Sequence, residues 1–126
     1  MVTAQPVVYI VEDDSSMRRA LERLVQSAGF EAQGFASGGD FLASGHRSRP
    51  ACVILDLRLP DMHGLEVQRR LARTDPSLMV VVVTSYEDEL TSREALGAGA
   101  ISFLSKPFDD RILLEAIGRA LGGPSE

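Results

Sequence analysis

The chain of 126 residues carries a formal net charge of −5, with 44% hydrophobic and 25% charged residues. These values are typical of a single globular domain and argue against a general nucleic-acid-binding surface, which would be basic. The longest apolar run, LMVVVV, is far too short to span a membrane, and the start MVTAQP lacks the pattern of a signal peptide. We therefore expect a cytoplasmic domain whose partners are proteins or metal ions, with no membrane contact and no direct nucleic-acid binding.

Apolar runs alternate with helical patterns five times along the chain. Strands are predicted at 7–11, 31–36, 51–57, 78–83 and 100–104, and helices at about 17–28, 37–44, 64–73, 87–97 and 112–121. Four of the strands are continuously apolar and rich in Val and Ile, which is typical of strands buried on both faces of a parallel sheet. Cys52 lies in one of them and is expected to be a buried hydrophobe. The run at 31–36 alternates poorly and contains Gly34, which predicts an edge strand.

The order of these elements predicts the fold class. Strands that alternate with helices through short joints must run parallel, with right-handed crossovers and helices on both faces. We therefore predict an α/β fold, a doubly wound five-stranded parallel sheet with five helices. Ligands of such sheets bind beyond the carboxyl ends of the strands. Candidate functional residues follow every predicted strand except the second, which favours the strand order 2-1-3-4-5.

The residues at the predicted strand ends form a consistent set. Glu12 and Asp13 follow the first strand, Asp56 lies near the end of the third, and Thr84 and Lys106 follow the fourth and the fifth. Neighbouring strands are about 4.8 Å apart, so short Asp side chains on adjacent strands can meet. The fifth strand lies two places away from the third, a distance that only a side chain as long as that of Lys106 can bridge.

Three carboxylates at adjacent strand ends are a hard oxygen site suited to Mg²⁺, which binds through a few carboxylates and keeps several waters. Glu12, Asp13 and Asp56 are the candidate ligands. Asp14 is interpreted instead as a solvated residue near the start of the first helix, where the helix dipole favours an anion. A carboxylate beside Mg²⁺, a Lys and a Thr hydroxyl is also a plausible phosphoryl acceptor, because carboxylates can form aspartyl phosphates and the cations neutralise the transferring group.

These residues belong to motifs that resemble a known family. VEDDSSMRR, DLRLPDMHG, TS after the fourth strand and KPF after the fifth resemble the receiver domain of bacterial two-component response regulators. FASGGDFL, LPDMHGLEVQRRL and KPFDDRILLEAIGRAL are most similar to the FixJ/NarL-type group. The resemblance covers almost the whole chain and implies a flavodoxin-like receiver domain at 1–122. Residues 123–126 would then begin a linker or mark an artificial end of the chain.

The resemblance implies a role for each acidic residue. Asp56 would take a phosphoryl group from a histidine kinase and become a 4-aspartylphosphate. Glu12, Asp13 and Asp56 would hold Mg²⁺ together with the backbone carbonyl of Arg58. Glu12 stands where many relatives have Asp, so it can reach the metal through a water.

The resemblance also implies how the signal leaves the site. Thr84 and Lys106 would bind the phosphoryl group, and Thr84 and Phe103 would be the switch residues that change conformation on phosphorylation. The helix at 87–97 and the strand at 100–104 would then form the surface of a phosphorylation-dependent homodimer, around Leu90, Ala95 and Ser102. In FixJ/NarL-type relatives a DNA-binding domain follows, which implies a part in transcription regulation. The Lys106-Pro107 bond is expected to be cis.

Two other functions use similar residues. A haloacid dehalogenase-type phosphatase also has an Asp after a strand, Mg²⁺, a Thr and a Lys, but carries a second Asp two residues later as general acid. Arg58 occupies that position here, so we expect a phosphoacceptor with slow self-dephosphorylation rather than an enzyme. A flavodoxin-like cofactor-binding module would have a Ser/Thr/Gly-rich loop after the first strand, where this chain is acidic. A stand-alone receiver that acts by protein–protein interaction is a further alternative.

Some residues also have a simpler structural interpretation. Phe103 taken alone would be a core aromatic, and His46 and His63 are interpreted as surface residues because neither has a second ligand at metal-binding spacing. The arginines of the first helix, Arg18 among them, are interpreted as part of a solvated face of mixed charge. A docking site for the kinase is the alternative for these arginines.

Overall fold

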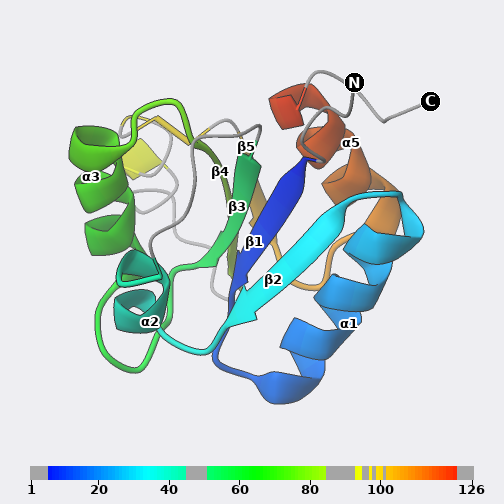
Figure 1. The fold of residues 1–126 in the computed structure, drawn as a ribbon, viewed down its shortest axis with the longest axis horizontal. Helices are drawn as coiled ribbons and strands as arrows, with labels where there is room; N and C mark the ends of the chain where they lie inside the picture. The colour runs from blue at the N-terminus through cyan, green and yellow to red at the C-terminus, as the bar shows by residue number, and fades with distance from the viewer. Residues whose placement is uncertain are drawn as a thin grey trace.

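The computed structural model describes residues 6–44, 51–84, 93, 94, 97, 99, 100 and 102–121. The strands are β1 (Val7–Val11), β2 (Glu31–Phe35), β3 (Ala51–Asp56), β4 (Met79–Thr84) and β5 (Ser102–Ser105), and the helices are α1 (Ser15–Ser27), α2 (Gly38–Leu42), α3 (Gly64–Thr74) and α5 (Asp110–Leu121). All strand pairs are parallel, and their order is β2-β1-β3-β4-β5. Figure 1 shows α2 and α3 on one face of the sheet and α1 and α5 on the other. The predicted fold class and strand order are confirmed, while the helix expected at 87–97 lies largely outside the described residues.

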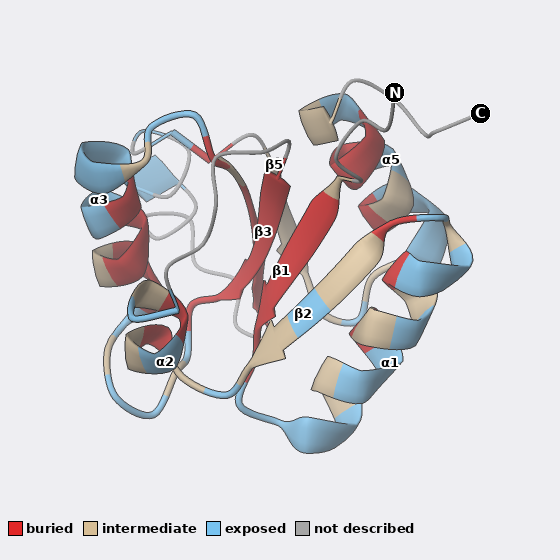
Figure 2. Ribbon diagram, in the orientation of Figure 1, coloured by how far each residue is buried: buried red, intermediate tan, exposed pale blue. Residues whose placement is uncertain are grey.

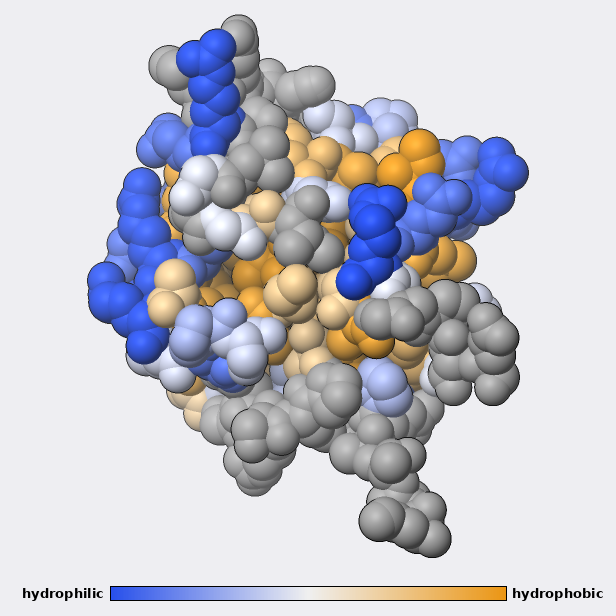
Figure 3. All heavy atoms as spheres, turned by 90° about the horizontal axis from the view of Figure 1, so that it is seen from above, coloured by the Kyte–Doolittle hydropathy of each residue, from blue (hydrophilic) through white to orange (hydrophobic). Residues whose placement is uncertain are grey.

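Burial on both faces accounts for the continuously apolar character of the central strands. Successive side chains of a strand point to opposite faces. Val7 and Tyr9 of β1 therefore join the core under α2 and α3, whereas Val8 and Ile10 join the core under α1 and α5. Figure 2 shows β1 and β3 buried along their length, and Figure 3 shows hydrophilic side chains around the outside of a more hydrophobic centre.

The edge strand and the buried cysteine lie where the sequence predicts them. The residues of β2 are half-buried or exposed, as expected at an edge. Cys52 is fully buried in β3, and burial raises the pKa of its thiol to about 12. Among the described residues, no helix is both long and apolar enough to cross a lipid bilayer.

Each of the first three helices begins at a side chain that caps its amino end. The carboxylate of Asp14 accepts the Ser16 and Met17 amides at 2.9 and 3.1 Å, in agreement with its interpretation as a residue at the helix start. Ser37 Oγ accepts the amide of Asp40 at the start of α2. At α3 the cap is His63, an exposed residue whose Nδ1 accepts the Leu65 amide at 3.1 Å. The prediction that His63 lies at the surface is confirmed, and His46 lies outside the described residues.

Candidate functional site

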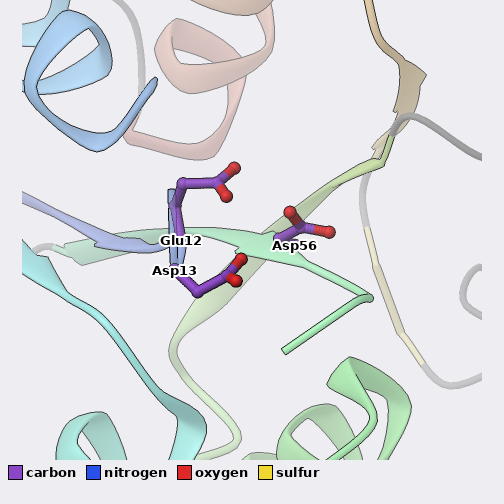
Figure 4. Close-up of side chains that lie close together, drawn as sticks. All are labelled: Glu12, Asp13 and Asp56. Atoms are coloured by element: carbon purple, nitrogen blue, oxygen red, sulfur yellow. The ribbon is translucent and has the colours of Figure 1, made fainter. Parts of the chain in front are cut away.

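The carboxyl ends of β1 and β3 bring three acidic residues together. The strands are adjacent, with Val11 paired to Leu55, so Glu12 and Asp56 follow at the same edge of the sheet. One carboxylate oxygen from each of Glu12, Asp13 and Asp56 lies within 4.8 Å of the others. Figure 4 shows the three side chains extending into the same space. The structure thus places the three candidate ligands in one cluster.

Glu12 is buried at this edge, and both of its carboxylate oxygens have partners. Its side chain is 2% exposed, and its backbone amide donates to the carbonyl of Phe35 on β2 at 2.9 Å. Oε2 accepts the Asp14 amide at 3.1 Å, and Oε1 accepts Lys106 Nζ at 2.6 Å. Burial raises the pKa of the Glu12 carboxyl, and the hydrogen bond from Lys106 opposes this effect.

Lys106 reaches the cluster from the far end of β5. Its backbone amide donates to the Thr84 carbonyl at 2.7 Å, which ties the ends of β4 and β5 together. Its ammonium donates to Glu12 Oε1 at 2.6 Å and to Asp56 Oδ2 at 3.0 Å. Burial acts to lower the pKa of Lys106, but the hydrogen bonds to Glu12 and Asp56 outweigh it and the pKa is raised. The ammonium therefore stays charged and offsets the repulsion between the two buried carboxylates.

Asp56 is buried and held from two sides. Its Oδ2 accepts Lys106, and its Oδ1 accepts the backbone amide of Arg58 at 2.9 Å, while the Arg58 side chain is exposed. Helix α3 begins directly against this strand end. A Cβ at Gly64 would lie 2.6 Å from the Asp56 carbonyl oxygen and 2.7 Å from Leu57 Cα, so only glycine allows this approach.

The donor set fits a magnesium ion. All three acidic residues offer hard oxygen ligands, and Asp13 is exposed, so water can complete the coordination of an ion bound there. The same arrangement sets a buried carboxylate beside a fixed ammonium. Such an arrangement can stabilise negative charge on a group transferred to Asp56.

The two residues expected to act as a switch lie on adjacent strands. Thr84 is the last residue of β4 and is buried. It lies one residue beyond Val83, the partner of Asp56 in the register between β3 and β4. Phe103 lies on β5 opposite Val82 of β4 and is partly buried against the core under α2 and α3.

Neighbouring segments give two further results. The Lys106-Pro107 peptide bond is cis, as predicted. Leu90 and Ala95, two of the residues expected on the dimer surface, lie outside the described residues, as does Tyr86, two residues after Thr84.

Two residues at this edge of the sheet have contacts that sequence reasoning missed. Arg18 does not belong to a purely solvated face: it is half-buried, and its Nη1 donates to the carbonyl oxygens of Glu12 at 2.8 Å and Asp13 at 3.4 Å. Asp61 accepts the amides of Gly38 at 3.1 Å and Gly39 at 2.7 Å. The position of Arg18 one turn after the acidic run indicates that it lies near that run but not which atoms it contacts. Nothing in the sequence pairs Asp61 with residues more than 20 positions earlier.

The fold and this cluster define a class of protein: a doubly wound α/β domain whose carboxyl edge carries a cluster of three acidic residues that could hold a cation, beside the partly buried ammonium of Lys106. Comparison with known proteins gives the family. Residues 8–118 match the model of the response regulator receiver domain. The chain belongs to this family, whose members act in phosphorylation-dependent signalling.

Individual relatives agree with this assignment. The chain is 39% identical to the response regulator protein TodT of Pseudomonas putida over 115 residues, which cover 91% of this chain and 51% of TodT. It is 36% identical to the transcriptional regulatory protein FixJ of Rhizobium meliloti over 113 residues, which cover 90% of this chain and 55% of FixJ. The structure of a response regulator receiver protein from Burkholderia phymatum matches with a TM-score of 0.82 and 40% identity, covering 96% of this chain and 98% of that one.

The likeness to FixJ fits the FixJ/NarL-type group. The chain spans about half the length of the curated relatives it matches.

Proposed function

We propose that this chain is a signalling switch in which Asp56 accepts a phosphoryl group from a cognate histidine kinase. The observation that carries this proposal is the position of Asp56, buried with its Oδ2 3.0 Å from the Lys106 ammonium and clustered with Glu12 and Asp13. A carboxylate oxygen of Asp56 forms the new bond to phosphorus. The bond from phosphorus to the donor imidazole nitrogen breaks, and its electron pair stays on that nitrogen.

In this proposal Glu12, Asp13 and Asp56 hold Mg²⁺ with the backbone carbonyl of Arg58. Bound Mg²⁺ would neutralise negative charge on the phosphoryl oxygens. The Arg58 amide, which donates to Asp56 Oδ1, fixes the orientation of the carboxylate. Lys106 is already placed by its bond to Glu12 and can move from Asp56 to the phosphoryl group.

The signal would pass through Thr84 and Phe103 to the surface of β5 and the helix expected at 87–97. The Thr84 hydroxyl would turn toward the phosphoryl group, and the Phe103 ring would enter the space that this movement leaves. The altered surface would then control a homodimer or an output domain. FixJ is named a transcriptional regulatory protein and is about twice as long as its matched region, which supports a DNA-binding output domain after residue 122.

The phosphoryl group would be long-lived, and the domain would act in the cytoplasm. Arg58, an exposed cation, stands where a haloacid dehalogenase-type phosphatase carries its general acid, so self-dephosphorylation would be slow. The family match at 8–118 disfavours that phosphatase and supports a receiver domain at 1–122, with residues 123–126 starting a linker. We place the domain in the cytoplasm, where a histidine kinase would phosphorylate it.

Incubation with acetyl phosphate and MgCl₂ tests the proposal. Mass spectrometry should detect one added phosphoryl group, which Asp56→Asn should abolish and Asp40→Asn, at an exposed position on α2, should not. Lys106 is the one lysine in the sequence, so a chain labelled with [¹⁵Nζ]-lysine reports its ammonium alone. That signal should shift on phosphorylation. Phosphate uptake by Asp56→Asn at the parent level would show that Asp56 is not the acceptor.

A further inference from the structure

Arg18 connects helix α1 to the backbone that carries two of the candidate metal ligands. Its Nη1 donates to the Glu12 carbonyl oxygen at 2.8 Å and to the Asp13 carbonyl oxygen at 3.4 Å. The side chain is half-buried, unlike that of Arg19, which follows it and is exposed. One guanidinium nitrogen thus contacts two of the three carbonyls in the turn between β1 and α1.

A glycine on the neighbouring strand leaves room for this contact. Gly34 lies on β2 opposite Ile10, two residues before Glu12. A Cβ at Gly34 would lie 3.0 Å from both Cγ and Cδ of Arg18, closer than such atoms normally approach, and would also meet the Glu22 carboxylate. The stem of Arg18 therefore crosses β2 at the position where the strand has no side chain.

The turn that carries the acids is held from two directions. On the β2 side, the Glu12 amide donates to the Phe35 carbonyl at 2.9 Å. On the α1 side, Arg18 binds the Glu12 and Asp13 carbonyls. Backbone torsions on either side of those carbonyls set where the Glu12 and Asp13 side chains point. Hydrogen bonds that hold these carbonyls in place therefore also fix the directions of the Glu12 and Asp13 side chains.

We propose that Arg18 is a positioning residue for the metal site, and that the missing side chain of Gly34 leaves the space in which the Arg18 side chain reaches the Glu12 and Asp13 carbonyls. The inference rests on the magnesium site proposed above. Arg18 contacts neither the ion nor the phosphoryl group. It acts through the backbone of Glu12 and Asp13, in the way that outer partners orient the ligands of other metal sites.

Removal of Arg18 eliminates both a positive charge and a restraint on two ligands, and these two losses should change the affinity for Mg²⁺ in opposite directions. A guanidinium bound to the backbone of two of the acidic residues weakens the attraction of the cluster for a cation, so the loss of its charge alone should tighten Mg²⁺ binding. Loss of the restraint on the two ligands should weaken binding. The sign of the change therefore separates a positioning role from a purely electrostatic one.

The test measures Mg²⁺ binding itself, by titration of the full chain with MgCl₂ and observation of the Asp13 and Asp14 amide signals by NMR. Arg18→Met keeps most of the stem that packs over Gly34 and removes the guanidinium. We expect its dissociation constant for Mg²⁺ to rise about 10-fold, at the lower end of the range for outer partners of metal ligands. Arg19→Met removes the same charge from the next position, and its constant should stay within about twofold of the parent or fall.

Two further variants keep the inference open to contradiction. Arg18→Lys retains the charge and a long stem but lacks the planar fork, and should bind Mg²⁺ with intermediate affinity. If Arg18→Met fails to fold, Arg18→Lys decides by the same measurement. Gly34→Ala in a Glu22→Ala background leaves a methyl group against the Arg18 stem alone, and should also weaken binding.

Each outcome has a definite meaning. Unchanged or tighter binding by both Arg18 variants would overturn the positioning role and leave the proposed metal site intact. A parent chain that shows no Mg²⁺-dependent shift at Asp13 or Asp14 would overturn the metal site and this inference together. Weaker binding by Arg18→Met and not by Arg19→Met supports both.

Discussion

The Lys106 ammonium lies 2.6 Å from Oε1 of Glu12, a residue 94 positions earlier in the chain. The side chains of Lys106 and Glu12 are only 14% and 2% exposed, so little water reaches either charge and each is stabilised by the other. Their contact joins the end of β5 to the end of β1 across β3 and β4. It is therefore both a feature of the candidate site and a link across the carboxyl edge of the sheet.

Removal of Lys106 should destabilise the fold. Lys106→Met would leave the buried carboxylates of Glu12 and Asp56 beside each other without a cation. Removal of one partner of a buried ion pair costs about 3 kcal/mol or more, and we expect a loss of that size in the free energy of unfolding at neutral pH. Urea denaturation measures it, with Arg111→Met, at a position exposed on α5, as the control.

The Lys106→Met variant also tests whether a bound divalent ion can take the place of the Lys106 ammonium. MgCl₂ should recover part of the loss in Lys106→Met, because a divalent ion in the cluster also neutralises Glu12 and Asp56. An unfolding midpoint of Lys106→Met equal to that of the parent without MgCl₂ would contradict the importance of this ion pair.

Asp61 should make stability depend on pH in the acid range. The hydrogen bond from the Gly39 amide is the main reason that the pKa of its carboxyl is lowered, with a further contribution from Gly38. A carboxyl whose pKa is lower in the folded state adds stability above its unfolded pKa, and that stability is lost as pH falls through the folded pKa. The parent should thus be more stable than Asp61→Asn at neutral pH, and the difference should shrink as the medium becomes acidic.

Urea midpoints of the two chains across that pH range measure the effect. Glu115→Gln, which removes an exposed carboxylate from α5, is the control for a general charge effect. Hydrogen exchange gives a local reading, because the Gly38 and Gly39 amides should lose protection in Asp61→Asn. A difference between parent and variant that stays constant with pH would show that the Asp61 charge does not stabilise α2.

The central part of the fold follows from local sequence patterns. The runs that became β1, β3 and β4 are continuously apolar because each is buried on both faces, whereas a strand with one solvated face would alternate apolar and polar residues. The proximity of Lys106 to Asp56 was predictable from side-chain length and strand spacing. Element boundaries were less so: α5 begins at Asp110, two residues before its first apolar residue, because its first turn is exposed and capped by the Asp109 carboxylate.

The contacts of Arg18 and Asp61 depend on packing and could not be predicted. The helical pattern places Arg18 off the apolar stripe, which says that it is not a core residue but not that its guanidinium turns back to the preceding carbonyls. The bond between Asp61 and Gly39 needs α2 to pack beside the loop after β3. Residue types and their spacing in the sequence do not indicate that α2 packs beside this loop.

Phosphorylated Asp56 should lose its phosphoryl group slowly, over many minutes or longer. Arg58 and Tyr86 stand two residues after Asp56 and Thr84 in the sequence. We expect these two positions to flank the path of an attacking water. Neither is an acid or an amide that would orient the water, and their bulk should hinder in-line attack. Mass spectrometry of the purified phosphoprotein over time gives the rate.

A double change tests this reason for the long lifetime. Arg58→Asn with Tyr86→Glu should speed the loss roughly tenfold or more, since a positioned base contributes at least that much to attack by water. Arg73→Asn, at an exposed position near the end of α3, is the control for charge. A half-life of seconds for the parent phosphoprotein would contradict the prediction.

Phosphorylation should also increase self-association through β5 and the helix expected at 87–97. That helix has few apolar residues, Leu90, Ala95 and Leu96, so it should be weakly anchored and cheap to shift. Thr84 lies buried at the end of β4, and Phe103 lies half-buried on the neighbouring strand opposite Val82. We expect a movement of the Thr84 side chain to open space for the Phe103 ring. By resemblance to FixJ-type receivers, the shifted surface would pair two-fold with a second copy.

Sedimentation with and without beryllofluoride, a phosphoryl mimic, measures this association. The parent should sediment as a monomer or weak dimer alone and as a tighter dimer with the mimic, whereas Asp56→Asn should not respond. Ser102 accepts a hydrogen bond from Arg119 at 3.2 Å and lies at the outer edge of β5, so Ser102→Arg should block the dimer without changing phosphate uptake by Asp56. Equal masses in both states over a wide concentration range, with unchanged hydrogen exchange at 84–104, would rule this mechanism out.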